Sequence, residues 1–438
     1  MPRLLITVVL LALGSVGPLG AQQQPVTPTG PLTLLQAISL GRRQGVDAAV
    51  ARLNVRAADA KVGERRADLL PNISGNASYL RQTLNLDQFG IPVATGVTDP
   101  FNILTLQLRG EQLLFDAGTI TRLRAARDTA VAAGLDAQAV GEIAGATAGL
   151  AYLRALSANE TIRAREADST VAAQLLGQAR QLVTAGVSPA IDATRSEVSF
   201  ASVRTQLEVA RNAADRAQLD LLRTLDLPSG TRLRLADSLG LGTLDLPLAP
   251  DTAAAFAREH RAELAAERSR TKAARNSLTA IRQENLPNLS LNGAYQQTGR
   301  QSSTLEGSYN VQLLLSVPIL DGFRRQSRAK EQSARLEVQE IREHDLVNRV
   351  ETEARQAVLD LASAQQQVAI AGDRLRLAEQ ELAQAQERFQ SGVASSVETT
   401  NAQGSVIGAR DALIQARVNY GTARVSAYRA LGVIDQLK

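Results

Sequence analysis

The chain contains one unit twice, and this internal repeat limits its fold more than any other feature. Segment 70–79, LPNISGNASY, returns 216 residues later as segment 286–295, LPNLSLNGAY. Farther along, Asp116 is matched by Asp321 at an offset of 205, and Gly186 by Gly392 at an offset of 206. The smaller offsets mean that one loop of the first copy is about eleven residues longer. The sequence therefore predicts two copies of one supersecondary unit in tandem.

The repeat and its breakers divide the chain into six parts. Residues 1–21 read as a cleavable signal, with Arg3 before a short apolar run and small residues at its end, so the mature chain lies outside the cytoplasm. Gln, Pro, Thr and Gly dominate a tether at 22–31. The remaining parts are repeat 1 at 32–226, a connector rich in Pro and Gly at 227–250, repeat 2 at 251–433 and a tail at 434–438.

Each repeat reads as helix, strand, strand, long helix, tight turn and returning helix. In the first copy we expect strands at about 72–83 and 102–115, a long helix at 117–184, a turn at 185–190 and a helix at 190–226. In the second copy the same elements fall at about 288–298, 307–317, 322–390, 391–396 and 397–433. Asp116 and Asp321 stand where helix N-caps belong.

The strands alternate between apolar and polar residues. Their polar face contains Asn72, Ser74, Asn76, Gln107, Arg109, Ser290, Asn292, Asn310 and Gln312. Strands of about ten residues suit a tilted crossing of a bilayer, and aromatic residues gather near the strand ends, as at Tyr79 and Tyr295. Alternation alone fits a soluble sheet equally well; export and the helices favour a membrane barrel with a polar lumen. Four strands cannot close a barrel, so several copies must contribute.

The helices are too long for a globular core. At 1.5 Å per residue, each long helix would measure on the order of 100 Å. In the second, apolar residues step by three and four from Val347 to Phe389, and the returning helix repeats this from Val406 to Ala430. Alanine fills one position of the seam from Ala357 to Ala385, which permits close approach. We expect an antiparallel coiled-coil hairpin.

Several classes of function find no support in the sequence. The chain has no cysteine and two isolated histidines, and it contains no phosphate loop, nucleophile motif or paired ligand spacing. We therefore expect neither an enzyme nor a cofactor or metal site. Arg and Glu alternate along the helices and aromatic residues are scarce, which argues against nucleic-acid binding despite the formal charge of +4.

The chain resembles the TolC-like outer-membrane efflux proteins. The resemblance rests on the duplicated strand pairs, the helix starts at Asp116 and Asp321, and the turns at Gly186 and Gly392. The most specific part is segment 388–398, RFQSGVASSVE, which resembles the tip motif of that family. The resemblance implies a fold that is mainly α with a membrane β-barrel part. Long antiparallel coiled-coil helices form an α-barrel across the periplasm, and four strands per chain contribute to one trimeric barrel in outer-membrane lipid.

The resemblance also implies partners. The homotrimer would be a passive exit duct of a tripartite efflux or secretion system, located in the bacterial cell outer membrane, with its tunnel in the periplasm. A periplasmic adaptor (membrane fusion) protein of an inner-membrane transporter would dock at the tip turns, formed by Gly186, Val187, Ser188, Arg388, Phe389, Gly392, Val393 and Ala394. Phe389 and Ala394 occupy positions where some members carry a tyrosine and an arginine that lock the tip, so that polar lock is absent here.

The periplasmic entrance is the other site that the resemblance implies. Glu398 matches an acid that lines the entrance in the family, but Asn401 stands where the second acid would be, so a double acidic ring is not expected. The first copy carries Asp192 and Arg195 at the corresponding positions. The alternative reading is a periplasmic coiled-coil scaffold or adaptor protein without a transmembrane barrel. The sequence leaves the exported substrate open between drugs, metal ions and polypeptides.

Overall fold

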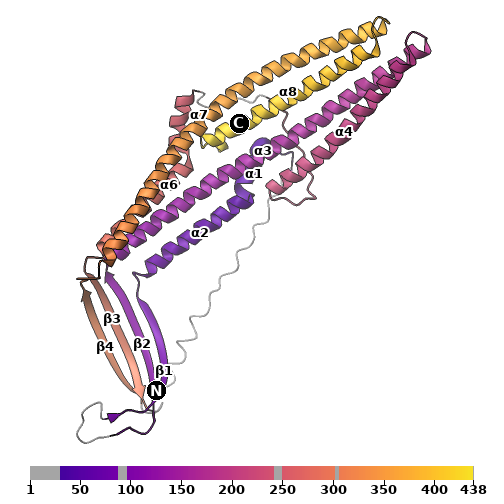
Figure 1. Cartoon of the computed structure of the whole chain (residues 1–438). Coiled ribbons are helices and arrows are strands. Elements are labelled where there is room, and N and C mark those ends of the chain that lie inside the picture. Colours follow the sequence, from indigo (N-terminus) through magenta and orange to yellow (C-terminus); the bar gives the residue numbers. More distant parts are fainter. Residues whose placement is uncertain (1–29, 87–95, 241–248, 301–304, 438) are drawn as a thin grey trace.

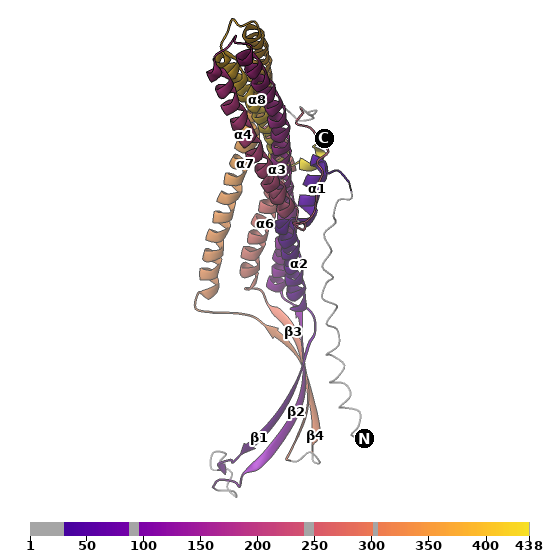
Figure 2. The same ribbon diagram turned by 90° about the vertical axis from the view of Figure 1, so that its right-hand side faces the viewer.

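The computed structural model describes residues 30–86, 96–240, 249–300 and 305–437. The predicted signal and most of the predicted tether lie outside these residues. Figure 1 shows an elongated molecule with the sheet at one end and two helical hairpin tips at the other. Figure 2 gives the view at 90° and shows the strong twist of the sheet. Among the described residues, none of the helices is both long and apolar enough to cross a membrane.

The two copies have the same element order. The first copy contains α1 (Leu34–Gln44), α2 (Val46–Ala67), β1 (Asn72–Gln82), β2 (Phe101–Phe115), α3 (Ala117–Thr184) and α4 (Ala190–Thr224). The second contains α5 (Pro250–His260), α6 (Ala262–Gln283), β3 (Asn288–Gly299), β4 (Glu306–Ser316), α7 (Arg324–Gln390), α8 (Ser396–Ala430) and a 3-10 turn η3 (Ile434–Gln436). The fold is therefore mainly helical with four strands and two repeats, as the sequence predicts.

The four strands form one antiparallel sheet in the order β1-β2-β3-β4, so β1 and β4 are its edges. The register pairs Asn76 with Gln107, and Gln107 with Gln296. Because paired residues point to the same side of a sheet, this register gathers the polar side chains of all four strands on one face. That face includes the nine residues predicted from alternation, together with Ser78, Thr105, Glu111, Gln296 and Ser308.

Two helix starts differ in their chemistry. The side chain of Asp116 accepts a hydrogen bond from the backbone N–H of Thr119 at 3.0 Å, which confirms it as the N-cap of α3. The expectation for Asp321 is wrong in position only: α7 begins at Arg324, and Phe323 occupies the N-cap position without a side-chain hydrogen bond. Gly322 and Phe323 both have positive φ, at 65° and 63°, so the chain cannot be helical there. Asp321 lies two residues before the N-cap, and its carboxylate still accepts a hydrogen bond from a first-turn backbone N–H, that of Arg325, together with one from the Arg325 side chain.

Each helix expected before a strand pair is broken into two. Gly45 separates α1 from α2, and Arg261 separates α5 from α6, with non-helical ψ angles of 138° and 115°. The buried guanidinium of Arg261 donates to the carbonyl oxygen of Ala430 at 3.1 Å and lies 3.2 Å from the carboxylate of Glu353. This break therefore fastens repeat 2 to the end of its own returning helix.

The predicted seam between α7 and α8 is confirmed. Its α7 members are buried or, at Val347, Leu375 and Leu382, partly buried against the core. The largest apolar cluster lies at mid-length, where α1, α3, α5, α7 and α8 meet the connector (Figure 1). The predicted tail belongs to this core, because Ile434 and Leu437 are buried in it.

Candidate functional site at the hairpin tips

The two tip turns are closed by the same backbone device. Gly186 has φ of 74° and Gly392 has φ of 70°, a conformation that favours glycine. The N–H of Val187 donates to the carbonyl of Leu182, and the N–H of Val393 donates to the carbonyl of Arg388, both at 3.0 Å. These bonds satisfy the last carbonyls of α3 and α7 and end each helix sharply.

A buried carboxylate joins the two turns. Asp192, in the first turn of α4, accepts a hydrogen bond from the hydroxyl of Ser188 on its own hairpin at 2.5 Å. It accepts another from the hydroxyl of Ser396, the first residue of α8, also at 2.5 Å. The Asp192 side chain is only 4% exposed and Ser396 only 1%. Sequence reasoning singled out Asp192 but missed Ser396, whose only signal is its place at a helix start.

The electrostatics at Asp192 favour the charged form. Burial alone would raise the pKa of this carboxyl. The hydrogen bonds from Ser188 and Ser396, with the guanidinium of Arg195 at 3.8 Å, outweigh burial and hold the pKa below the ordinary value of an aspartate. The link between the hairpins is therefore charged at neutral pH.

Glu398 forms an ion pair with Arg388. Its carboxylate lies 2.9 Å from Nε of Arg388, on the other side of the second turn. Both side chains are largely exposed, so this pair is worth about 1 kcal/mol or less. The pair nevertheless places a cation beside the acid for which the family resemblance implies a place at the entrance.

Arg195 and Asn401 lie on opposite walls of a groove between α4 and α8. The groove has a volume of about 690 Å³ and is also lined by Val198, Val397 and Ile407. Gln403 borders it, and its buried Nε2 has no hydrogen-bond partner among the described residues. The structure thus brings three tip features together: the Asp192 link, the Arg388–Glu398 pair and this groove. The groove itself was not predicted, because its walls come from helices about 200 residues apart.

Farther from the tips, a charge network centred on buried Arg165 and Asp168 joins α3 to α8. Arg165 donates to Asp168 at 2.7 Å and also bonds Asp411, while Arg410 bonds Asp168 from α8. Burial raises the pKa of Asp168 even though Arg410 and Arg165 act against it. This network fixes the rotation of one hairpin against the other above the tips.

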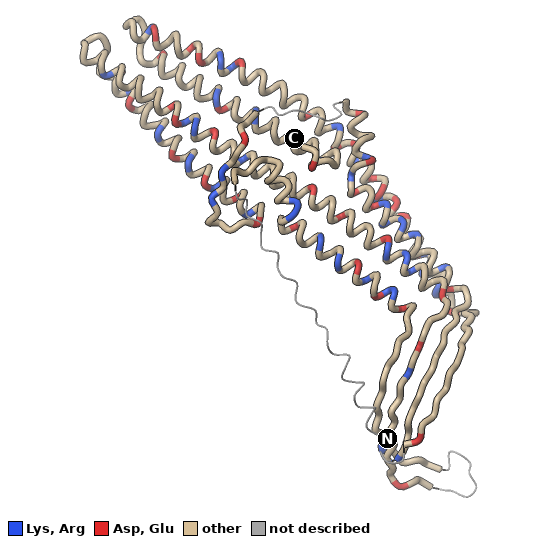
Figure 3. Tube along the Cα trace, turned by 180° about the vertical axis from the view of Figure 1, so that it is seen from behind, with Lys and Arg blue, Asp and Glu red and all other residues tan. Residues whose placement is uncertain are grey.

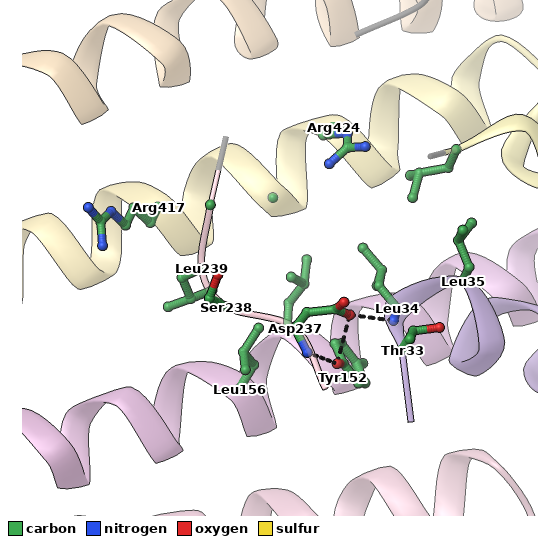
Figure 4. Close-up of a pocket in the computed structure, with 14 residues that line it drawn as sticks. Thr33, Leu34, Leu35, Tyr152, Leu156, Asp237, Ser238, Leu239, Arg417 and Arg424 are labelled. Atoms are coloured by element: carbon green, nitrogen blue, oxygen red, sulfur yellow. Dashed lines mark hydrogen bonds between the residues drawn. The ribbon is translucent and has the colours of Figure 1, made fainter. Parts of the chain in front are cut away.

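A pocket of about 390 Å³ lies at mid-length, between the connector, α3 and α8 (Figure 4). The hydroxyl of Tyr152 lies 2.8 Å from the carboxylate of Asp237, which also accepts from the N–H of Leu34 at 2.7 Å. Burial beside Asp237 raises the pKa of Tyr152 well above its ordinary value. The contacts fasten the connector to the start of α1, so we assign this pocket a structural role.

No group of three or more His, Cys, Asp or Glu side chains among the described residues could hold a metal ion. The charged groups at the tip are instead arranged in pairs that hold helices together.

Comparison with known proteins adds a family match. A family model described as outer membrane efflux protein matches residues 39–225 and 255–433. Protein CyaE of Bordetella pertussis is 27% identical over 332 residues, which are 70% of this chain. The match spans 64% of CyaE, less than two thirds of its length.

Solved structures show the same fold. CusC matches with a TM-score of 0.79 and 18% identity, covering 91% of this chain and 92% of that one. The CmeC outer membrane channel of Campylobacter jejuni matches with a TM-score of 0.80 and 16% identity, covering 92% and 86%. The open state of the MtrE outer membrane channel of Neisseria gonorrhoeae gives 0.78 and 17%, covering 92% and 90%.

Proposed function

Because the chain belongs to the outer membrane efflux protein family, we propose that it is the outer-membrane channel-tunnel of a tripartite efflux or secretion system. In this role it is a passive exit duct. Substrates reach it from an inner-membrane transporter through a periplasmic adaptor protein.

The observation that carries the proposal is the separation of two ends by long helices. One end is a sheet whose faces differ, with Ile73, Leu108 and Val311 on the apolar side and Asn76, Gln107 and Asn310 on the polar side. The other end holds both hairpin tips (Figure 1). An apolar face suits lipid and a polar face suits a water-filled lumen. The helices then span the space between a membrane and the tips.

A single chain leaves its sheet and its helical wall open. Strands β1 and β4 are edges, and open edges cannot persist in lipid because their backbone groups lack partners. In the helical wall next to the sheet, α2 packs on α3, α3 on α6 and α6 on α7, so α2 and α7 are the outer members. Both carry exposed apolar side chains, including Val46, Val50 and Leu53 on α2 and Val338 and Ile341 on α7. Further copies of the chain would cover these edges.

The number of copies comes from the family, whose channels form trimers. Twelve strands would then close one barrel, and α7 of each copy would meet α2 of the next. The nine polar strand residues predicted from alternation would line the lumen.

We place the periplasmic entrance and the adaptor contact at the tips. The groove with Arg195 and Asn401 on its walls, and the turns at Gly186 and Gly392, offer an adaptor both apolar surface and hydrogen-bonding groups. Asp192 would hold the tip closed by joining the hairpins, and Glu398 with Arg388 would set the charge of the opening.

The test is where the protein partitions and what it conducts. Expressed in a Gram-negative host, the mature protein should fractionate with the outer membrane, purify as a trimer and conduct ions in planar bilayers. A periplasmic scaffold would be a soluble monomer without conductance, and that result would overturn the proposal. The exported substrate depends on the transporter, so competition assays with drugs, metal ions or polypeptides need that partner present.

A further inference from the structure

Charged residues are rare in the sheet, and two of them lie close together on one strand. The four strands contain Arg81, Arg109, Glu111 and Glu306. Arg81 and Glu306 are at the end far from the helices, whereas Arg109 and Glu111 are neighbours on the helix-proximal half of β2. Figure 3 shows this isolated pair of charges within an otherwise uncharged stretch of sheet.

Both side chains are on the polar face. Arg109 is paired with Ser74 on β1 and with Ala294 on β3. Glu111 is paired with Asn72 and Asn292. Both are exposed, and neither forms an ion pair with another described residue. The adjacent strands therefore supply no opposite charge beside either group.

Neighbouring copies of the chain cannot supply an opposite charge through the strand edges. Strand β2 is internal, with β1 on one side and β3 on the other, so the next copy meets β1 or β4 and not β2. If the sheet closes into a barrel as proposed above, Arg109 and Glu111 remain directed into the lumen. This inference rests on that proposed function.

We propose that Arg109 and Glu111 of the assembled copies form two adjacent charged rings in the barrel lumen, which filter charged solutes within the outer membrane. Strand β2 runs toward the helices, so the Glu111 ring lies on the tunnel side and the Arg109 ring on the outer side. A solute leaving the tunnel meets the negative ring first and the positive ring second. This filter is separate from the entrance at the tips.

The dimensions allow such rings to act across the whole lumen. Twelve tilted strands at 4.8 Å spacing enclose a barrel of roughly 24 Å between facing backbones. Long side chains bring their charges to within about 10 Å of the axis, which is the screening length at 0.1 M salt. Ions on the axis therefore experience both rings at moderate salt, and much less at 1 M.

The absence of cysteine makes a direct test possible, because a single introduced thiol is the only reactive one. Gln107→Cys places the thiol on the polar face, two residues outward from Arg109. Intact cells are treated with an anionic or a cationic methanethiosulfonate reagent, and the two modification rates are compared. Leu108→Cys, on the opposite face, reports whether that face is covered by lipid.

The rate ratio of anionic to cationic reagent should fall about threefold to fivefold when Arg109→Gln is added to Gln107→Cys at 0.1 M salt. Glu111→Gln should raise the ratio by a smaller factor, and 1 M salt should suppress both effects. Arg81→Gln is the matched control, because it removes the same charge from the apolar face and should leave the ratio unchanged.

One possible result would contradict the charged rings alone, and another would contradict the proposed channel function. If Gln107→Cys reacts, Leu108→Cys does not, and Arg109→Gln leaves the ratio unchanged, the charged rings are ruled out while the channel stands. If Leu108→Cys reacts as fast as Gln107→Cys, the sheet does not separate lipid from lumen, and the proposed function itself fails.

Discussion

Replacing Asp192 by alanine removes a carboxylate that accepts hydrogen bonds from both tip turns. In the wild-type chain its two oxygens receive the hydroxyls of Ser188 and Ser396, each at 2.5 Å. Of these two bonds, the one to Ser396 joins the two hairpins, whereas Ser188 belongs to the same hairpin as Asp192. Asp192→Ala and Ser396→Ala should therefore loosen the tip, whereas Ser188→Ala should leave the hairpins joined.

The expected magnitude follows from burial. A hydrogen bond to a charged group contributes about 1.5–3 kcal/mol, and a buried hydroxyl left without a partner costs about 1–3 kcal/mol. Ser396 is 1% exposed, so its hydroxyl cannot turn to water unless the turns separate. Loss of about 2 kcal/mol per copy would shift the equilibrium between closed and open tips by roughly 30-fold.

The link should also depend on pH. The pKa of Asp192 in the folded chain is below its ordinary value of about 3.9, so the charged link stabilises the folded tip above that value. This stabilisation is lost as the pH falls through the lower, folded pKa. Wild-type conductance should rise only below about pH 4, and Asp192→Ala should lack that step.

Single-channel recording of the purified protein in planar bilayers measures these effects, with circular dichroism to verify that each variant is folded. Asp192→Ala and Ser396→Ala should increase open probability by similar factors, and the double variant should add little. If Ser188→Ala opens the channel as much as Ser396→Ala, or if Asp192→Ala leaves conductance unchanged, the Asp192–Ser396 bond does not hold the tip closed.

Three further variants test the entrance, the mid-length core and the seam. Glu398→Lys sets two cations against each other at Arg388 and should lower the K⁺/Cl⁻ permeability ratio several-fold in a salt gradient; an unchanged reversal potential would exclude Glu398 from the entrance. Burial raises the pKa of Glu142 to about 7, despite Arg42 and Arg261. The folded chain therefore binds more protons than the unfolded chain between about pH 4.3 and 7, so wild-type thermal stability should fall from pH 5 to pH 8. Glu142→Gln should remove that fall, which amounts to at most about 3 kcal/mol; an equal fall in the variant would assign it to another group. Ala409 is 0% exposed in the seam, and Ala409→Leu should cost about 1–3 kcal/mol by overpacking. It should lower the thermal midpoint, while Ser405→Ala on the exposed side should not; equal midpoints would mean that the seam can expand.

At the tip, the turns could be predicted from the sequence, but the contacts between the hairpins could not. The glycine turns at 186 and 392 were predictable, because a left-handed residue between two apolar repeats has a local signature. The Asp192–Ser396 bond and the groove between α4 and α8 were not, since their members are about 200 residues apart. Glu398 was assigned to the entrance as an acid, but its pairing with Arg388 depends on the path of the chain through the turn.

The starts of α3 and α7 also differ, although their sequences match. Asp116 and Asp321 occupy matched positions, yet only Asp116 is the N-cap residue itself, whereas Asp321 reaches the backbone N–H of Arg325 from two residues before the N-cap. Two consecutive residues with positive φ, Gly322 and Phe323, displace the start of α7 and turn Asp321 toward Arg325. A motif shared by two copies therefore does not guarantee the same local geometry.

The repeat, the strands and their faces, and the seam of the second hairpin could all be predicted from the amino-acid sequence. These features follow from the periods of strand and helix, which covalent geometry fixes at two and 3.6 residues. The pairing of charges, the helix break at Arg261 and the open edges became visible only in the folded chain. Such contacts depend on how one hairpin is rotated against the other, and packing of many small side chains sets that rotation, with no period along the chain to reveal it.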